Sequence, residues 1–187
     1  SVEGSGAAAS EGKVTISSAG TYVLSGKFTG QILVTAADSD KVKIVLDGAE
    51  ISSSTDAAIR VKSAEEAVVI AAEGTVNSVS DTSKHADSSG PTAAIASSAD
   101  LTLGGAGTLN VTGNGNDGVS SSDGLVILGG KINVKAADDA VRGQDYVVIA
   151  GGTLSLQAKG DAVKADNETA SGRGYVLVTG GNVTASA

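Results

Sequence analysis

Acidic side chains recur at a constant spacing in the second half of the chain, and this spacing suggests a binding site for a cation. A short phrase returns every 22 residues: Asn116-Asp117-Gly118-Val119, Asp138-Asp139-Ala140-Val141 and Gly160-Asp161-Ala162-Val163. Six residues after each central Asp comes a second acceptor, at Asp123, Asp145 and Asn167. A fixed period of this length is typical of solenoids, which stack equivalent residues of successive turns. We therefore expect two columns of acidic side chains.

Stacked carboxylates repel one another unless their charge is compensated. At about 5 Å the repulsion is on the order of 1 kcal/mol in water, and several-fold larger where solvent is reduced. Protonation, pairing with bases or a bound cation would lower this cost. Oxygen ligands without neighbouring His or Cys favour Ca²⁺. The predicted calcium ligands belong to the two columns: Asn116, Asp117, Asp123, Asp138, Asp139, Asp145, Asp161 and Asn167. A structural role is the alternative, because Asp and Asn also cap turns and form side-chain ladders at such corners.

Basic and aromatic side chains fall in register beside these columns. Arg60, Arg142 and Lys164 occupy one row, with Ser120 as a gap, and we expect its later members, Arg142 and Lys164, to point outward. The row either compensates the acidic charge or binds a sugar carboxylate. Tyr146 and Tyr175 share a register on successive turns, and they either form a small platform for a sugar ring or cover a corner.

Short strands must position these side chains. The hydrophobic fraction is 41%, aromatic residues make up only 2%, and 26 glycines punctuate the chain. Apolar residues repeat at period two within strands and at period 22 between turns. Leu125 and Val147 form one such aligned pair, and Ile132 and Leu154 form another. The pattern predicts an all-β fold: a right-handed single-stranded parallel β-helix, or solenoid, with three short strands and about 22 residues per rung.

The chain is expected to form a single domain over residues 13–187, preceded by a flexible leader at residues 1–12. The wide spacing between Ile59 and Ile95 predicts a surface loop at residues 80–91, and a smaller insertion interrupts the last full rung at residues 168–174. The only histidine, His85, lies in the first loop, and we predict it to be solvated and without a role. An open end of the coil could stack on a neighbour.

Charge and composition exclude several functional classes. The formal net charge of −8 argues against a nucleic-acid partner, whose phosphates need a basic surface. The chain has no apolar run long enough to cross a bilayer, so we expect no membrane insertion. The absence of Cys excludes disulfides, thiolate metal sites and cysteine catalysis, and it slightly favours a location outside the cell.

Several ordered phrases resemble a known family. They are GTYVLSG at residues 20–26, VLDGAEI at 45–51, DLTLGGAGTL at 100–109, and the stretch 138–145. Together they resemble the pectate-lyase-like carbohydrate-binding β-helix family of cellulolytic clostridia, over nearly the whole chain from Lys13. The resemblance implies a secreted or surface-attached bacterial protein that binds Ca²⁺ at Asp-rich corners. It also implies binding of polygalacturonate and cellulose without established lyase activity.

The acidic pattern of that family maps onto this chain with two departures. It matches Asp117, Asp138, Asp139, Asp145 and Asp161. Gly160 stands where the pattern has its first Asp, and Asn167 stands where it has its last, which weakens the final site.

The function we expect is non-catalytic, calcium-assisted binding of an acidic plant polysaccharide such as polygalacturonate or pectin. Cellulose is less favoured, because its binding usually uses coplanar aromatic rings, which are scarce in this chain. Two alternatives remain. One is a calcium-dependent pectate lyase with Arg142 or Arg60 as its base. The other is a structural adhesin or stalk in which the coil is a rigid spacer.

Overall fold

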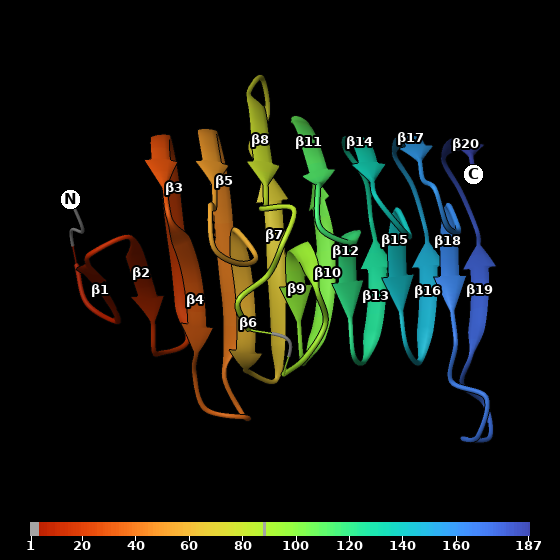
Figure 1. Ribbon diagram of the computed structural model, residues 1–187, viewed down its shortest axis with the longest axis horizontal. Coiled ribbons are helices and arrows are strands. Elements are labelled where there is room, and N and C mark those ends of the chain that lie inside the picture. The colour runs from red at the N-terminus through yellow and green to blue at the C-terminus, as the bar shows by residue number, and fades with distance from the viewer. Residues whose placement is uncertain (1–3, 88) are drawn as a thin grey trace.

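The computed structural model describes residues 4–87 and 89–187, and within them every regular element is a β-strand. The predicted all-β class is therefore confirmed. Two sheets contain these strands, and all their pairings are parallel except the first, between β1 and β2 (Figure 1). No helix that could span a membrane occurs in the described part of the chain.

The first sheet has eight strands in chain order. They are β1 (Ala7–Ser10), β2 (Lys13–Ile16), β4 (Gln31–Thr35), β6 (Ile59–Ser63), β9 (Ala93–Ser97), β12 (Asp117–Ser121), β15 (Val141–Gly143) and β18 (Val163–Ala165).

The second sheet has twelve strands in two arms that meet at the long strand β5 (Lys41–Ser52), beside which β3 (Gly20–Thr29) also pairs. One arm contains β7 (Glu66–Ala71), β10 (Asp100–Gly105), β13 (Gly124–Ile127), β16 (Tyr146–Ile149) and β19 (Tyr175–Val178). The other contains β8 (Val76–Ser80), β11 (Thr108–Gly113), β14 (Lys131–Ala136), β17 (Thr153–Gln157) and β20 (Asn182–Ser186).

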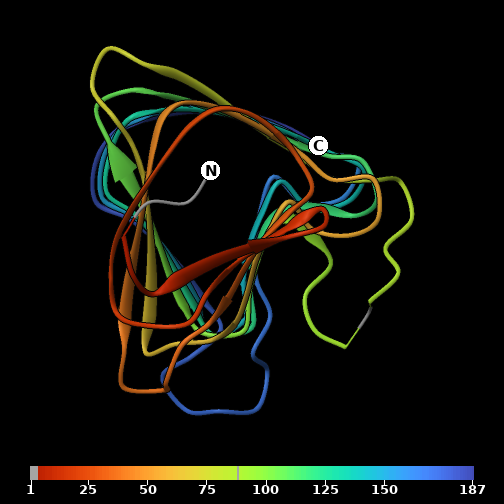
Figure 2. The same cartoon turned by 90° about the vertical axis from the view of Figure 1, so that its left-hand side faces the viewer.

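The chain visits the first sheet and then each arm of the second sheet in turn, and successive circuits stack in register. Val119 pairs with Val141, and Val141 pairs with Val163, each 22 positions later. Viewed along its long axis, the chain follows nearly superimposed circuits (Figure 2). The predicted apolar columns are thus brought into contact, because in-register parallel pairing aligns residues that share a position in the repeat.

Departures from the 22-residue spacing coincide with the two insertions. Val147 pairs with Val176, which is 29 positions later and so seven beyond 22, the length of the insertion at 168–174. Ile59 pairs with Ile95, 36 positions later. The extra residues connect β8 to β9 and stand away from the stacked circuits in Figure 2.

The interior is filled by aliphatic side chains that alternate along the strands. In β14, Ile132 and Val134 are each 2% exposed, whereas the neighbouring Lys131 and Lys135 are exposed. The last circuit has no further strand above it in the described chain, so Val176 and Val178 of the same interior columns are 45% and 55% exposed. Short aliphatic side chains suit such layers, because each one fills the small space within a single circuit.

One expectation about the beginning of the chain needs correction. Residues 1–12 are predicted to be a flexible leader, but Ala7–Ser10 form β1 and pair with Lys13–Ile16 of β2 in antiparallel register. Residues 1–3 lie outside the described residues. The small residues at 7–10 join the sheet because a neighbouring edge strand offers unpaired backbone groups, which composition does not reveal.

Shortening one side chain of an interior column should destabilise the fold. Ile127 is fully buried in β13, so Ile127→Ala should lower the free energy of unfolding by about 2–5 kcal/mol. Val126→Ala, on the outer side of the same strand, is the control and should cost about 1 kcal/mol or less. Urea denaturation followed by circular dichroism measures both. Equal losses in the two variants would contradict the assignment of the interior.

Candidate metal centre

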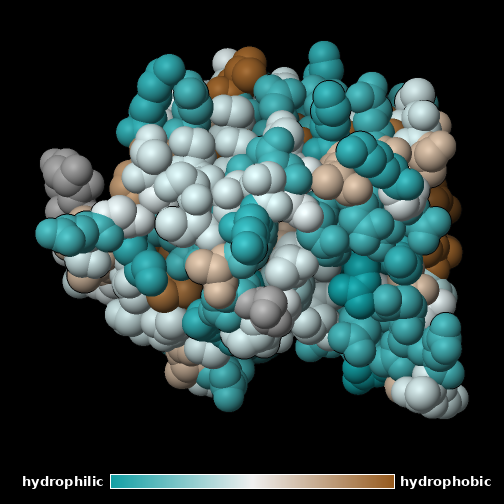
Figure 3. Space-filling model, in the orientation of Figure 1, coloured by the Kyte–Doolittle hydropathy of each residue, from teal (hydrophilic) through white to brown (hydrophobic). Residues whose placement is uncertain are grey.

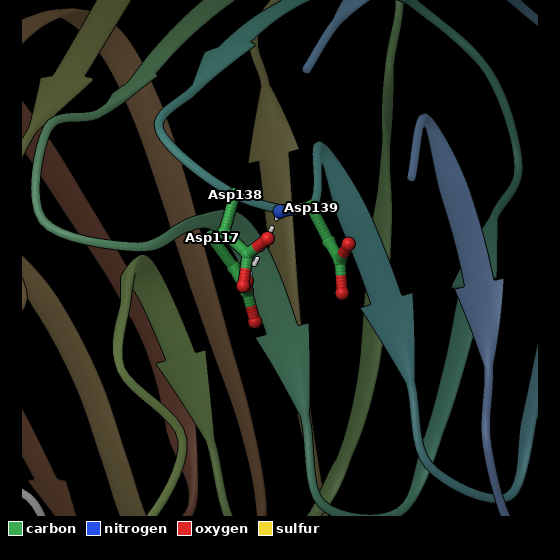
Figure 4. Close-up of side chains that lie close together, drawn as sticks. All are labelled: Asp117, Asp138 and Asp139. Carbon is green, nitrogen blue, oxygen red and sulfur yellow. Dashed lines mark hydrogen bonds between the residues drawn. The ribbon is translucent and has the colours of Figure 1, made fainter. Parts of the chain in front are cut away.

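Three carboxylates converge at the corner where the chain enters β12 and β15. One oxygen from each of Asp117, Asp138 and Asp139 lies within 4.8 Å of the others (Figure 4). We call these residues the carboxylate cluster. Within residues 4–87 and 89–187, it is the one group of three such ligands that meets this distance. The structure therefore brings together three of the eight predicted calcium ligands.

Backbone hydrogen bonds between successive circuits hold the cluster in place. The carboxylate of Asp117 accepts the N–H of Asp139 at 3.3 Å, and the carboxylate of Asp139 accepts the N–H of Asp161 at 2.7 Å. The carbonyl of Asn116 accepts the N–H of Asp138 at 3.0 Å. Each central Asp thus fixes the backbone of the next circuit, and the 22-residue repeat positions the charges.

Gly160 leaves room beside the cluster. A Cβ atom at this position would lie 2.6 Å from an oxygen of Asp139 and would also collide with the Asp138 carboxylate. The departure from the acidic pattern at Gly160 therefore has a steric consequence, because it keeps a side chain out of the space next to the two carboxylates.

Burial raises the energy of the charged cluster. Asp117 is 3% exposed and Asp139 is 2% exposed. Burial raises the pKa of Asp117 to about 6, and the charge of Asp139 adds to this effect, whereas hydrogen bonds from the Asp139 N–H and the Ser120 hydroxyl oppose it. Lys164 lies 3.0 Å from the Asp139 carboxylate, and this hydrogen bond raises the pKa of Lys164.

The donor set of the cluster fits Ca²⁺. Its three carboxylates and the ammonium of Lys164 carry a formal charge of −3 + 1 = −2, which a divalent cation would neutralise. All the ligand atoms are hard oxygens, which Ca²⁺ prefers, and carboxylates can bind it in monodentate or bidentate fashion. Asp138 is exposed, so solvent or a ligand can approach the cluster from that side.

The second acidic column lies beyond the other end of the same strands and is partly compensated by the protein itself. Asp145 forms an ion pair with Arg173 and accepts a hydrogen bond from the Asn167 amide at 2.6 Å. Arg173 also lies 3.9 Å from Asp123. Burial and the charge of Asp100 raise the pKa of Asp123, and the charge of Arg173 opposes this rise. The structure does not bring Asp123, Asp145 and Asn167 to the carboxylate cluster.

Asp161 and Asn116, the other predicted ligands, lie at the margin of the cluster. The Asp161 side chain is 63% exposed and lies 3.6 Å from Lys164. The Asn116 amide donates to the Asp117 carboxylate at 3.1 Å, and so it supports a ligand.

The basic row is only partly exposed. Arg142 and Lys164 pair in register on the first sheet, as predicted, and Ser120 fills the gap before Arg142. Arg142 contacts Asp166 at 2.7 Å, and Lys164 contacts Asp139. These contacts favour charge compensation. The hydrophilic residues around β12, β15 and β18 gather over the C-terminal half of the face seen in Figure 3.

Arg60 and His85 differ from their predictions because of the loop between β8 and β9. Arg60 is a predicted ligand-binding residue, but it is only 3% exposed and donates to the Pro91 carbonyl at 2.8 Å. His85 is expected to be solvated, but its side chain is 5% exposed and its Nε2 lies 2.6 Å from the Asp81 carboxylate. The two ends of the loop cover these groups, because Pro91 lies against Arg60 and Asp81 lies against His85.

The two tyrosines stack along the coil. The rings of Tyr146 and Tyr175 are 5.7 Å apart between centroids, with an interplanar angle of 20°. A Cβ at Gly124, one circuit earlier, would collide with the Tyr146 ring. The faces of Tyr146 are therefore covered by its neighbours, so the pair does not offer two coplanar rings to a flat sugar chain.

Sequence reasoning missed Arg173 and Asp166, which neutralise other charges. Both lie in or beside the insertion at 168–174, which belongs to no column. The one available signal is composition, since Arg173 is the one basic residue of that insertion.

Neutralising Asp117 should change the pH dependence of stability. Its folded pKa of about 6 exceeds the unfolded value of 3.8, so the folded protein binds more protons between about pH 4 and pH 6, and its stability falls as the pH rises through that range. In metal-free buffer, Asp117→Asn should therefore be more stable than the parent at pH 8, by up to about 3 kcal/mol, and similar to it at pH 4. Urea denaturation at both pH values measures the difference. A constant difference would contradict the assignment.

Removing Arg173 should expose the cost of a buried charge. Arg173→Ala leaves Asp145, 4% exposed, without its cationic partner and should cost roughly 1–3 kcal/mol. Adding Asp145→Asn should recover part of this loss, because the unpaired charge is then absent. Thermal melts of the two single variants and the double variant form the cycle. No recovery would show that Arg173 acts by packing alone.

Comparisons with known proteins agree with this architecture. A family model described as carbohydrate-binding domain-containing protein matches residues 10–187. A protein of that name from Acetivibrio thermocellus is 38% identical over 136 residues, which make up 70% of this chain and 48% of that protein, so the chain spans about half the length of this relative. A solved structure, the gadolinium derivative of the polysaccharide lyase-like protein from C. thermocellum, superposes with a TM-score of 0.95 at 35% identity and covers 98% of this chain and 76% of that one. The chain therefore belongs to the family of carbohydrate-binding domain-containing proteins.

Proposed function

We propose that this chain binds an acidic polysaccharide such as polygalacturonate without cleaving it, assisted by Ca²⁺ at the carboxylate cluster. Family membership and the polysaccharide lyase-like relative support a polysaccharide ligand. The single observation that carries the calcium role is the convergence of three carboxylates, two of them buried, within 4.8 Å.

The need for a cation follows from charge. The chain has a formal net charge of −8, and a polyuronate is also negative, so the two should repel. Bound Ca²⁺ would supply local positive charge and open coordination positions for a uronate carboxylate. Asp117 and Asp139 would hold the ion from the buried side, while the exposed Asp138 would leave the outer side accessible.

Basic side chains can add direct contacts near the cluster. The Arg142 and Lys164 side chains are 26% and 36% exposed, and they lie on adjacent strands of the first sheet. Each has N–H donors beyond those that its Asp partner accepts, so a sugar carboxylate could share them. Tyr146 and Tyr175 contribute less, because their faces cover each other.

A calcium-dependent lyase is the second candidate function. It is considered because a similar structure is that of a polysaccharide lyase-like protein. A lyase needs a base within reach of the substrate. Arg60 is buried beneath Gly90 and Pro91, which argues against it in this role. Arg142 is held by Asp166, so its guanidinium is engaged in an ion pair. For these reasons we propose binding without catalysis.

Two finer features belong to the same proposal. We infer that the stacked circuits form a right-handed single-stranded parallel β-helix with about 22 residues per rung, which the spacing of Val119, Val141 and Val163 supports. We also infer a secreted or cell-surface location, where plant polysaccharide is accessible. Stacking on a neighbour through an end of the coil is part of the same proposal, because an unpaired strand edge can accept further strands.

Removal of one buried ligand should weaken calcium-assisted binding. Asp139→Ala should weaken Ca²⁺ binding about ten-fold or more, because it deletes one of three carboxylates and leaves Lys164 without its closest partner. Calorimetric titration of the metal-stripped protein measures Ca²⁺ affinity, and gel retardation in polygalacturonate with and without EGTA measures ligand binding. Asp161→Asn, with an exposed carboxylate outside the cluster, is the matched control and should bind nearly as the parent does.

The alternatives give distinct results in the same experiments. Release of unsaturated product, detected by ultraviolet absorbance, would show that the chain is a lyase and would contradict binding without cleavage. Retardation that EGTA leaves unchanged would remove calcium from the proposal but keep the ligand. If neither retardation nor product is observed, the remaining function is that of a rigid spacer.

A further inference from the structure

We propose that Asn114 is a site of spontaneous covalent modification, at which its side-chain amide is converted to an aspartyl or isoaspartyl group. Asn114 and Gly115 lie in the short connection between β11 and β12, against Asp81 at the start of the loop that joins β8 to β9. Such a change goes beyond the proposed function, because it alters the chain itself and requires neither a cation nor a polysaccharide.

The reaction joins the Asn114 side chain to the backbone of the next residue. The backbone nitrogen of Gly115 gives up its proton and attacks the side-chain carbonyl carbon of Asn114. A new C–N bond forms, the bond from that carbon to the amide nitrogen breaks, and ammonia leaves with the proton. Water then opens the cyclic succinimide at either of its two carbonyl carbons. One opening gives aspartate, and the other gives isoaspartate, in which the backbone runs through the side-chain carbons. Water is the one co-reactant.

The residue after Asn114 favours this reaction. Asn114 is the one asparagine of the chain that precedes a glycine. A side chain on the following residue crowds the attacking nitrogen, and glycine has none. The fold itself requires glycine here, because a Cβ at position 115 would lie 2.6 Å from the Thr82 carbonyl oxygen and 2.9 Å from the His85 ring. The contact with the loop therefore maintains the sequence that makes Asn114 reactive.

The surroundings of Asn114 leave the reacting groups accessible. Asn114 is exposed and lies in a bend between two strands. The backbone N–H of Gly115 donates to no acceptor among residues 4–87 and 89–187. In contrast, the N–H that follows Asn116 belongs to Asp117 and donates to the Thr92 carbonyl at 3.2 Å. The reaction should therefore select Asn114 over its neighbour.

Strand pairing protects other asparagines of the chain. Asn110 and Asn133 lie inside β11 and β14, which pair in continuous register, and a valine follows each of them. The β-branched valine crowds the backbone nitrogen, and the regular backbone of a paired strand resists the bending that ring closure needs. These two residues therefore serve as internal references for the reactivity of Asn114.

Modification of Asn114 would release the start of the loop. The Asn114 amide donates to the Asp81 carbonyl at 2.8 Å, and the Asn114 backbone N–H donates to the Asp81 carboxylate. Asp81 is 5% exposed, and its other carboxylate oxygen lies 2.6 Å from Nε2 of His85. A carboxylate at position 114 cannot donate to the carbonyl, and it places a negative charge beside a buried one. An isoaspartyl linkage also lengthens the backbone and displaces the N–H.

Incubation of the folded protein in warm, mildly alkaline buffer with EGTA tests this inference. The buffer is prepared in heavy-oxygen water, so that a group formed before digestion carries the label. Peptide mass spectrometry with fragmentation locates each modified residue. Asn114 should be modified at least about ten-fold faster than Asn110 or Asn116, because glycine follows it and its reacting groups are free.

Two variants separate the reaction from its consequence. Asn114→Gln keeps an amide but closes a larger ring much more slowly, so it should stay unmodified and its melting temperature should not change on incubation. Asn114→Asp reproduces one product and should melt below the fresh parent, as the incubated parent does. Asn133→Gln is the matched control for loss of an asparagine elsewhere, and it should leave the rate at Asn114 unchanged.

Three outcomes would overturn the inference. The first is a rate at Asn114 no higher than the rates at Asn110 and Asn116. The second is a modified residue without the heavy-oxygen label, which would place the reaction in the digestion step. The third is an incubated parent that is modified at Asn114 but melts as the fresh protein does, which would show that the contact with Asp81 does not hold the loop.

Discussion

In-register parallel stacking forces equivalent side chains of successive circuits against each other. For aliphatic residues this is favourable, because Val119, Val141 and Val163 bury one another in a continuous column. For acidic residues it is costly, because the same geometry brings like charges together where burial reduces screening. Asp117 and Asp139 are both nearly inaccessible, yet the backbone N–H groups of Asp139 and Asp161 need their oxygens as acceptors. The corner therefore carries negative charge that its own hydrogen bonds require, and a positive partner must offset it.

The protein meets this requirement differently at the two ends of the same strands. At the second column, Arg173 pairs with Asp145, and Asn167 replaces a further carboxylate with an amide that donates to it. Arg173 thus compensates the buried Asp145 from within the protein. At the carboxylate cluster, Lys164 is the one cation among the described residues that pairs with Asp139, and Gly160 keeps the adjacent space open. Lys164 faces three carboxylates at the first corner, whereas Arg173 faces two at the second, which is why the first corner is the better candidate for a cation.

Periodic features could be predicted from the sequence, and features built by the insertions could not. The apolar columns and the row Ser120, Arg142 and Lys164 follow from a constant spacing, so counting residues placed them in register. Arg60 has the same place in the repeat but is buried by the loop that ends at Pro91, whose path no spacing describes. The structure brings only some of the eight predicted calcium ligands together, for a related reason. The repeat places each column at a corner, but Arg173 enters from an insertion and removes the second column from consideration.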